Sequence, residues 1–306
     1  MDRNVRAFLA VAQAGNLTVA ADRIGLTQPA LTKTIRRIEE DYDAVLFERT
    51  SRGMNLTPAG EMLLERMRLM ELHERQAREE IRSLQEGALA EFRVAAGSSY
   101  HLLFAPELVR QLSAEFPQTR FVLDFRSARD ALPRLQQGEL DMVLGAVAHT
   151  PSEGILVKRL LDVEVTAYCC RSNSLARRRE ALTAAELVPR RWVINRSDTQ
   201  IVERLNHFFS DQLLAEPEVA MEIDSLIAGF MVVSGTELLV PAPTIVRTFA
   251  EAQGLVMLQL VEPLWKFRSG AWFPKSLERY AVLRRSLEIL EDLISAIPSG
   301  YGMTQK

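Results

Sequence analysis

The stretch from Asn16 to Gly60 decides the fold, and it reads NLTVAADRIGLTQPALTKTIRRIEEDYDAVLFERTSRGMNLTPAG. Before it, apolar residues recur at helical spacing until Gly15, which predicts a first helix. Asn16 or Thr18 can cap a short second helix that Gly25 ends. Thr27 is a suitable cap for a third helix, with Pro29 in its first turn, where the missing N–H costs nothing.

The third helix sorts its residues by chemistry. At about 100° per residue, Leu31, Ile35 and Ile38 share one side, which should pack on the first two helices. Pro29, Lys33 and Arg36 fall on the opposite side. Thr32 and Arg37 flank them, and Gln28 lies at the N-terminal tip. A helix that lies in the major groove needs this order, with polar groups for base edges and cations for phosphates. The alternative is a solvated helix face that happens to be basic.

A hairpin is expected after this helix. The segment LFERTSRGMNLT, residues 46–57, alternates, turns at Arg52-Gly53 and alternates again, which predicts two short strands bearing Arg49 and Arg52. Arginine at a hairpin tip suits a narrow minor groove, where the negative potential is high.

These motifs together resemble the winged helix-turn-helix of LysR-type transcriptional regulators. The resemblance is carried by Thr27-Gln28-Pro29-Ala30-Leu31-Thr32-Lys33, Leu46-Phe47-Glu48-Arg49, Arg52-Gly53 and Leu56-Thr57-Pro58-Ala59-Gly60, in that order. One departure is Tyr42-Asp43-Ala44, where the family usually has a leucine-glycine-valine-like turn. We expect a DNA-binding domain over residues 1–58. The candidate DNA contacts are Thr18, Thr27, Gln28, Pro29, Thr32, Lys33, Arg36, Arg37, Arg49 and Arg52.

A long helix is predicted from Pro58 to about Gln85, within a linker over residues 59–88. Its apolar residues step alternately by four and three, interrupted by Glu74, which is the pattern of a seam between two helices. The candidate dimerisation residues are Leu63, Met67, Met70, Ala77, Ile81 and Leu84. The alternative is a helix packed on its own domain. The family resemblance agrees with the seam, since it implies a dimerisation helix here.

Composition limits the remaining possibilities. A chain of 306 residues should form two or three domains, and its net charge of −3 excludes a general nucleic-acid-coating character. DNA binding must therefore come from a local patch. No apolar run is long or clean enough to span a bilayer, and the apolar stretch near the N-terminus is too short for a signal peptide. The adjacent Cys169 and Cys170 are expected to be reduced packing residues, with redox sensing as the alternative. We expect a cytoplasmic protein without a membrane partner.

Beyond Gly87, strands alternate with helices, which predicts a parallel sheet covered on both faces. Predicted strands are 92–96, 120–125, 140–146, 163–170, 192–195, 219–223, 237–240 and 256–261. Predicted helices run from Gly97-Ser98-Ser99 to Phe116-Pro117, over a short irregular segment after Ser127, and near 199–214, 224–233, 243–252 and 276–296.

This region also resembles the LysR family, more loosely than the N-terminal part does. The matching motifs are the strand-Gly97-Ser98-Ser99-helix opening, Gly138-Glu139-Leu140-Asp141 and the run from Val233 to Pro241, in which Glu237 replaces a usual glycine. The resemblance implies an α/β effector domain of the periplasmic-binding-protein type over residues 89–298. Its subdomain I would cover about 89–161 and 267–298, and subdomain II about 162–266. Crossings are expected near 161–165 and 263–267, and a loose tail over 299–306.

A ligand in such a sheet should lie past the strand ends, where helix N-termini favour an anion. Ser98 and Ser99 lie at one such end, Ser127 at another, and Ser197, Asp198, Thr199 and Gln200 at a third. In LysR-type proteins the first of these turns commonly contacts the effector. The candidate effector contacts are Ser98, Ser99, Ser127, Ser197 and Thr199. The alternative is that these residues are ordinary helix caps.

The sequence predicts an effector-responsive LysR-type regulator rather than an enzyme. No phosphate-cradling glycine pattern and no G-x-S-x-G elbow is present. The four histidines have neither mutual metal spacing nor an obvious carboxylate partner in sequence: His73, His101, His149 and His207. No catalytic residue, metal or cofactor is therefore expected. The expected partners are duplex DNA, a small anionic effector, the chain itself as homodimer or homotetramer, and RNA polymerase. Two other classes stay open: an enzyme fused to a DNA-binding head, and an architectural DNA binder without a ligand.

Overall fold

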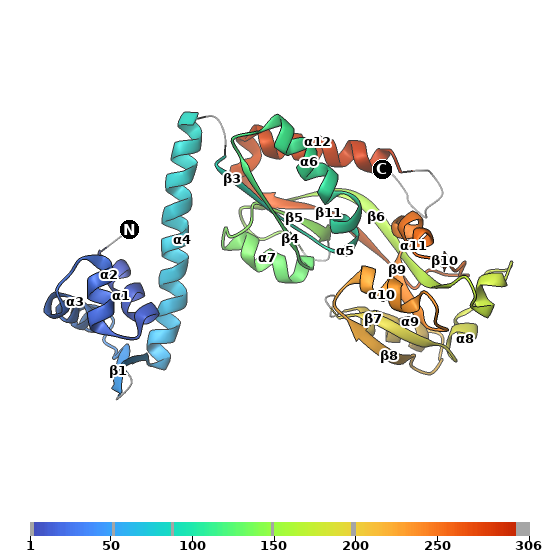
Figure 1. The fold of residues 1–306 in the computed structure, drawn as a ribbon, viewed down its shortest axis with the longest axis horizontal. Coiled ribbons are helices and arrows are strands. Elements are labelled where there is room, and N and C mark those ends of the chain that lie inside the picture. Colours follow the sequence, from blue (N-terminus) through green and yellow to red (C-terminus); the bar gives the residue numbers. More distant parts are fainter. Residues whose placement is uncertain (1–2, 51–52, 87–88, 148–149, 197–199, 298–306) are drawn as a thin grey trace. The chain divides into compact units, whose positions relative to one another are not determined.

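The computed structural model describes residues 3–50, 53–86, 89–147, 150–196 and 200–297. The chain divides into two compact units, Met1–Glu86 and Gly87–Lys306 (Figure 1).

The first unit is a helical domain with a small hairpin. Its elements are α1 (Arg3–Ala14), α2 (Leu17–Ile24), α3 (Gln28–Asp41), β1 (Phe47–Thr50), β2 (Gly53–Leu56) and α4 (Pro58–Glu86). Of the two candidate caps for α2, Asn16 is the one observed, because its side chain accepts hydrogen bonds from the backbone N–H groups of Thr18 and Val19. The predicted cap of α3 is confirmed, since Thr27 Oγ1 accepts from the backbone N–H of Ala30 at 3.4 Å.

The base of the hairpin is fixed on two sides. The backbone N–H of Met54 donates to the carbonyl of Gly15 at 2.7 Å. This approach requires glycine at position 53, where a Cβ would stand 2.3 Å from that same oxygen. At the other strand, Glu39 Oε1 accepts from the backbone N–H groups of Leu46 and Phe47. The hairpin base is thus tied both to the α1–α2 turn and to α3. Arg52 and the side chain of Arg49 lie outside the described residues.

The structure of α4 contradicts part of the predicted dimerisation seam. Leu63 and Met67 are 8% and 3% exposed and belong to the apolar core of the first unit. They do so because the start of α4 packs against α1. Further along, Met70 and Ile81 are 54% and 59% exposed and Ala77 is also exposed, whereas the side chain of Leu84 lies outside the described residues. The bare apolar stretch of α4 therefore begins at Met70.

The second unit is built on one mixed sheet, which contains nine strands among the described residues. The strands are β3 (Glu91–Ala96), β4 (Arg120–Phe125), β5 (Met142–Ala146), β6 (Ile155–Cys170), β7 (Arg191–Asn195), β8 (Glu218–Ile223), β9 (Leu239–Pro243), β10 (Leu255–Met257) and β11 (Trp265–Pro274). Their order is β4-β3-β5-β11-β6-β9-β7-β8, with β10 paired to β6. Strands β3, β4 and β5 are parallel and form the first half of the sheet; β7, β8 and β9 are parallel and form the second half.

The prediction of a purely parallel sheet is wrong, because β6 and β11 run antiparallel to each other and to their neighbours. These two strands occupy the stretches where crossings were expected, with Trp265 opposite Val165 and Ser269 opposite Leu161. The register then shifts so that Gly270 faces Arg159, which leaves Leu160 as a bulged residue. A Cβ at position 270 would lie 2.2 Å from the carbonyl oxygen of Lys158, so this approach also requires glycine.

Helices cover both faces of the sheet (Figure 1). They are α5 (Ser98–Leu103), α6 (Ala105–Glu115), α7 (Ala128–Gln136), α8 (Ala184–Leu187), α9 (Ile201–Ser210), α10 (Leu226–Val233), α11 (Arg247–Ala252) and α12 (Ala281–Ser295), with 3-10 turns at Ser174–Arg177, Thr244–Val246 and Lys275–Arg279. The alternation along β3 explains the two layers: Phe92 and Val94 pack in the core with α6 and α12, whereas Ala95 packs with α7.

One predicted helix is divided in two. The sequence pattern predicts a single helix from the Gly97 turn to Phe116, but the structure has α5 and α6 with a break at Phe104. Pro106 lies in the first turn of α6. A proline at that place lacks an N–H and clashes with a continuous preceding helix, so the chain starts a new helix there.

We predict that replacing Asp43 changes the stability of the first unit in a residue-specific way. Asp43 has φ 47° and an exposed side chain, in the turn that follows α3. Glycine adopts this left-handed backbone freely, so Asp43→Gly should raise the unfolding free energy by about 0.5 kcal/mol, whereas Asp43→Ala should lower it by about as much. Hydrogen exchange of the buried α3 amides in the full chain measures both changes. Equal stability of the two variants would contradict a strained turn.

Candidate DNA-contacting surface and ligand cavity

The outer face of α3 is exposed as the sequence pattern predicts. Leu31, Ile35 and Ile38 are buried in the unit's core. On the outer side Gln28, Pro29, Lys33, Arg36 and Arg37 are exposed, Thr32 is half-buried, and Thr18 and Thr27 are exposed nearby. The helix thus presents polar groups at its N-terminal end and cations along its length.

The cations of this face keep their charge available. Within the described residues, none of Lys33, Arg36 and Arg37 forms an ion pair with a carboxylate. The nearest acid in sequence, Glu39, is engaged with the start of β1. Such a bare basic surface attracts a polyanion even though the whole chain carries a net charge of −3.

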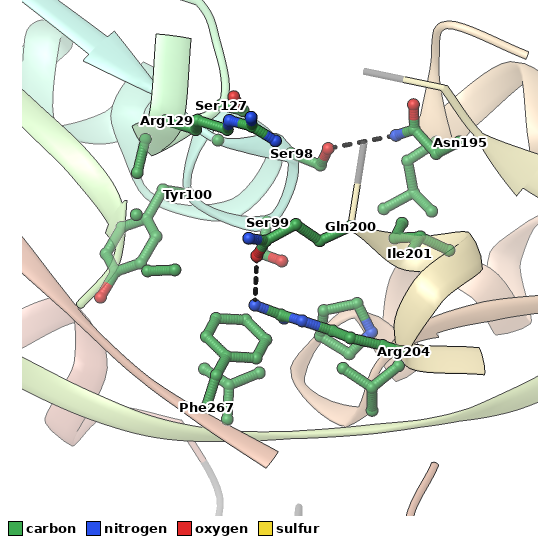
Figure 2. Close-up of a pocket in the computed structure, with 18 of the residues that line it drawn as sticks. Ser98, Ser99, Tyr100, Ser127, Arg129, Asn195, Gln200, Ile201, Arg204 and Phe267 are labelled. Atoms are coloured by element: carbon green, nitrogen blue, oxygen red, sulfur yellow. Dashed lines mark hydrogen bonds between the residues drawn. The ribbon is translucent and has the colours of Figure 1, made fainter. Parts of the chain in front are cut away.

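A cavity of about 150 Å³ lies within the second unit, between the two halves of the sheet (Figure 2). Helices α5 and α7 supply one side, α9 and α10 another, and β6, β9 and β11 complete the wall. Its lining residues are Gly97, Ser98, Ser99, Tyr100, Phe125, Ser127, Ala128, Arg129, Leu132, Gly145, Ala146, Val163, Val165, Asn195, Gln200, Ile201, Arg204, Leu226, Pro241, Pro243, Trp265 and Phe267. An apolar cavity with a few polar groups is the usual form of a small-molecule site.

Three of the five predicted effector contacts line this cavity. The cap of α5 is Gly97 and has no side chain, so Ser98 and Ser99 are not the ordinary caps of the alternative interpretation. Ser98 Oγ instead accepts a hydrogen bond from Asn195 Nδ2 at 3.3 Å, across the two halves of the sheet. Ser127 does cap α7, because its oxygen accepts from the backbone N–H of Asp130 at 3.3 Å. Ser197 and Thr199 lie outside the described residues.

The structure adds two arginines that the sequence pattern did not single out. Arg204, on the second turn of α9, donates from Nη2 to Gln200 Oε1 at 2.8 Å, and its guanidinium carbon lies 5.9 Å from the centre of the Phe267 ring. Arg129 comes from α7, on the other half. Among the described lining residues there is no Asp or Glu. No local signal could have found Arg204, since Phe267 lies on a strand that the pattern missed.

A hydrogen-bond chain joins the cavity wall to the β6–β11 pair. The Tyr100 hydroxyl lies 3.0 Å from Ser269 Oγ, which in turn donates to the carbonyl of Leu161 at 3.0 Å. All three residues are buried. Burial raises the pKa of the Tyr100 phenol, and the bond to Ser269 opposes this only partly, so the group stays neutral at physiological pH. Ser269 is also the residue at which the register shifts.

The two cysteines lie on opposite sides of β6, as successive strand residues should. Both are free thiols and buried. Burial raises the pKa of Cys169 to about 12, so it behaves as an apolar packing residue. The pKa of Cys170 is lowered, because the Ser172 hydroxyl and the backbone N–H of Gly235 donate to its sulfur. A chemical role for either thiol stays a hypothesis.

Two searches of the described part of the chain bear on other site classes. No group of three or more His, Cys, Asp or Glu residues is arranged there to hold a metal ion. None of the helices described there is both long and apolar enough to cross a bilayer.

A helix-turn-helix unit followed by an α/β unit with a ligand-sized cavity defines a DNA-binding regulator with an effector domain. Family models agree over nearly the whole chain. Residues 3–61 match the bacterial regulatory helix-turn-helix protein, lysR family, and residues 85–294 match the LysR substrate binding domain. The chain belongs to the LysR family of transcriptional regulators, and the fold class predicted from its sequence is confirmed.

Curated relatives are regulators as well. The chain is 36% identical to the HTH-type transcriptional regulator ClcR of Pseudomonas putida over 161 residues, which cover 52% of this chain and 54% of ClcR. The matched part thus spans about half the length of that relative. A longer match, 26% identical over 271 residues, is to the SDS degradation transcriptional activation protein of a Pseudomonas species; it covers 88% of this chain and 87% of that protein.

Solved structures support the fold. Full-length CbnR in complex with its target DNA matches with a TM-score of 0.65 at 20% identity and covers 96% of this chain and 100% of that one. A full-length OxyR variant from Pseudomonas aeruginosa matches with a TM-score of 0.61 at 18% identity, over 99% of this chain and 97% of that one. At these identities the likeness concerns the fold alone.

We predict that Ser269→Ala destabilises the second unit more than Tyr100→Phe does. Without Ser269 Oγ the buried Tyr100 hydroxyl loses its partner, which should cost about 1–3 kcal/mol. Without the Tyr100 hydroxyl, Ser269 keeps the Leu161 carbonyl as acceptor, so that loss should be about 1 kcal/mol. Thermal and urea unfolding of the full-length variants give the comparison. The double variant should be no less stable than Ser269→Ala alone. If the losses of unfolding free energy in the two single variants simply add, the proposed hydrogen-bond chain from Tyr100 to Leu161 is wrong.

Proposed function

We propose that this chain binds two half-sites of an imperfect palindrome as a homo-oligomer, and that a small anionic effector in the cavity of the second unit modulates that binding or the activation that follows. One observation carries the proposal. The exposed basic face of α3, which we take as the recognition helix, and a ligand-sized cavity lined by serines and arginines occur in the same chain. The first suits a polyanionic duplex, and the second suits a small anion.

On the DNA side, each predicted contact has a role that fits its position. Gln28 and Thr32 lie at the N-terminal end of α3, where side chains reach base edges. Lys33, Arg36 and Arg37 lie further along and suit phosphates. We assign backbone positioning to Thr18, Thr27 and Pro29, and minor-groove contact to Arg49 and Arg52.

For assembly, we infer that α4 pairs with a second copy through its bare stretch. Met70, Ala77 and Ile81 are exposed apolar residues at heptad spacing, and Leu84 continues that spacing in the sequence. A homodimer or homotetramer supplies the two DNA-binding units that a palindrome needs. RNA polymerase is a candidate partner of an activating complex, and the cytoplasm is the compartment where such a regulator meets chromosomal DNA.

On the effector side, a ligand touching both halves of the sheet can shift a conformational equilibrium. The cavity wall combines Ser98, Ser99, Ser127 and Arg129 from the first half with Asn195 and Arg204 from the second. A ligand that binds one arrangement of the halves more tightly than another shifts the population toward it. That shift is how we infer that effector binding reaches the DNA-binding units.

The two alternative classes have less support. An architectural binder without a ligand predicts a cavity lined only by packed apolar side chains, whereas this one carries hydroxyl, amide and guanidinium groups. An enzyme fused to a DNA-binding head predicts chemical turnover of a saturating ligand. Recovering such a ligand unchanged after incubation with the purified protein would argue against that class.

The direct experiment is footprinting of the purified protein on its own upstream region, combined with a thermal-stability screen of small carboxylates. Protection of two half-sites one helical turn or a multiple apart is expected. Protection that shows no preferred sequence would contradict the proposal.

We predict that Lys33→Ala weakens DNA binding without changing its sequence preference. Loss of one phosphate contact should lower affinity uniformly across sequences and reduce the slope of log K against log salt by about 1. Titration by fluorescence anisotropy at several salt concentrations measures both quantities. Lys158→Ala serves as the matched control, because Lys158 lies in the second unit, paired with Glu291.

We predict that Gln28→Ala relaxes sequence preference at one or two base positions, with the salt slope unchanged. An amide at the tip of the recognition helix acts through base-edge hydrogen bonds worth about 1–3 kcal/mol of discrimination. Affinities for a set of single-base variants of the footprinted site measure the effect. If Gln28→Ala weakens all sequences equally, the base-reading role of Gln28 is wrong.

A further inference from the structure

We propose that the effector is a flat, single-ring aromatic carboxylate, and that Arg204 is the cation that holds its carboxylate against the Phe267 face of the cavity. This inference rests on the proposed function and names the ligand class of the same cavity. It depends on the cavity's charge, its walls, its size and the way in which Arg204 is held.

The charge of the cavity selects an anion. Arg129 and Arg204 line it, and the described lining residues include no Asp or Glu. The described residues also provide no ion pair for Arg204. A neutral partner, Gln200, holds its guanidinium instead. The positive charge of Arg204 is therefore available to a ligand, and it favours a carboxylate over a neutral compound of the same shape.

Arg204 is oriented before any ligand arrives. Its Nη2 donates to Gln200 Oε1 at 2.8 Å, and its guanidinium lies over the Phe267 ring. In Figure 2 the side chain extends from α9 into the cavity, toward Ser99 and Phe267. A guanidinium fixed in this way loses little freedom on binding, and its planar fork matches the two oxygens of a carboxylate.

The walls suit a flat apolar body. Tyr100, Phe125, Trp265 and Phe267 supply aromatic surface, and aliphatic side chains fill the space between them. Aromatic rings pack well on one another in offset or edge-to-face contact. The aliphatic lining residues are Leu132, Val163, Val165, Ile201 and Leu226.

The size of the cavity suits a ligand of about one ring. Its volume is about 150 Å³. An apolar cavity of about that volume in an unrelated protein binds benzene, which gives the scale. A single six-membered ring matches this scale, whereas an acid as small as acetate would leave the aromatic walls uncovered.

The test compares four probes on the full-length protein, by calorimetry and by thermal stabilisation. Benzoate has both the ring and the charge, benzamide has the ring without the charge, cyclohexanecarboxylate has the charge on a puckered ring, and acetate has the charge alone. We expect benzoate to bind best, and benzamide and acetate each to bind at least about tenfold more weakly. The affinity of cyclohexanecarboxylate should lie between that of benzoate and those of the other two probes.

Two variants of Arg204 locate the charge. Arg204→Gln should abolish the preference for benzoate over benzamide. Arg204→Lys keeps the charge without the planar fork, so it should keep the preference but bind benzoate about tenfold more weakly. The matched control is Arg196→Gln, because Arg196 lies in the same half of the sheet but pairs with Asp224 and does not line the cavity. The melting temperature without ligand shows whether each variant is folded.

Three results would overturn the inference: equal affinity of the wild-type protein for benzoate and benzamide, an unchanged preference in Arg204→Gln, or no stabilisation by any of the ring acids up to about 10 mM. None of them touches DNA binding, which the footprint measures separately. A specific footprint without benzoate binding would reject the ligand class and leave the regulator intact. Benzoate binding without a specific footprint would do the reverse.

Discussion

The pairing of β6 with β11 is the constraint on which the second unit depends. These strands run antiparallel through the middle of the sheet, with β5 on one side of the pair and β9 on the other. Among the described strands, β3, β4 and β5 lie on one side of this pair and β7, β8 and β9 on the other, so the two halves of the sheet are joined through it. The cavity lies against the same ladder, since Val163, Val165, Trp265 and Phe267 line it. The site therefore exists because two distant segments of the chain pair at this point.

Local chemistry allowed the first unit to be predicted well. Caps, turn glycines and the sorting of α3 into an apolar and a basic side depend on residues only a few positions apart, and Asn16, Thr27 and Gly25 behave as such signals should. The second unit was harder. β11 was missed although Lys266 and Arg268 alternate with apolar residues, because this alternation is short and ends at Ser269-Gly270. Arg204 and Phe267 meet only through that strand, so their contact has no signature in a single sequence.

The same reasoning explains why α4 was only partly understood from its repeat. A heptad pattern states that a helix buries a stripe, but it does not name the partner. The side chains of Leu63 and Met67 are buried in the core of the first unit, whereas those of Met70 and Ile81 are exposed. Likewise, the net charge of −3 does not describe the outer face of α3 or the cavity of the second unit. Both carry cations, and acids elsewhere in the chain balance their charge. In both cases a single description, of the helix or of the whole chain, conceals regions with different roles.

The bulge at Leu160 is linked to the cavity wall by hydrogen bonds. One extra residue in β6 bends that strand and increases the local twist of the ladder at this point. Ser269 lies at the same register shift, and it holds the phenol of Tyr100, which is part of the cavity lining. The cavity wall is thus joined through two hydrogen bonds to the bulged part of the ladder. The bend of the ladder and the shape of the cavity wall therefore depend on the same buried hydrogen bonds.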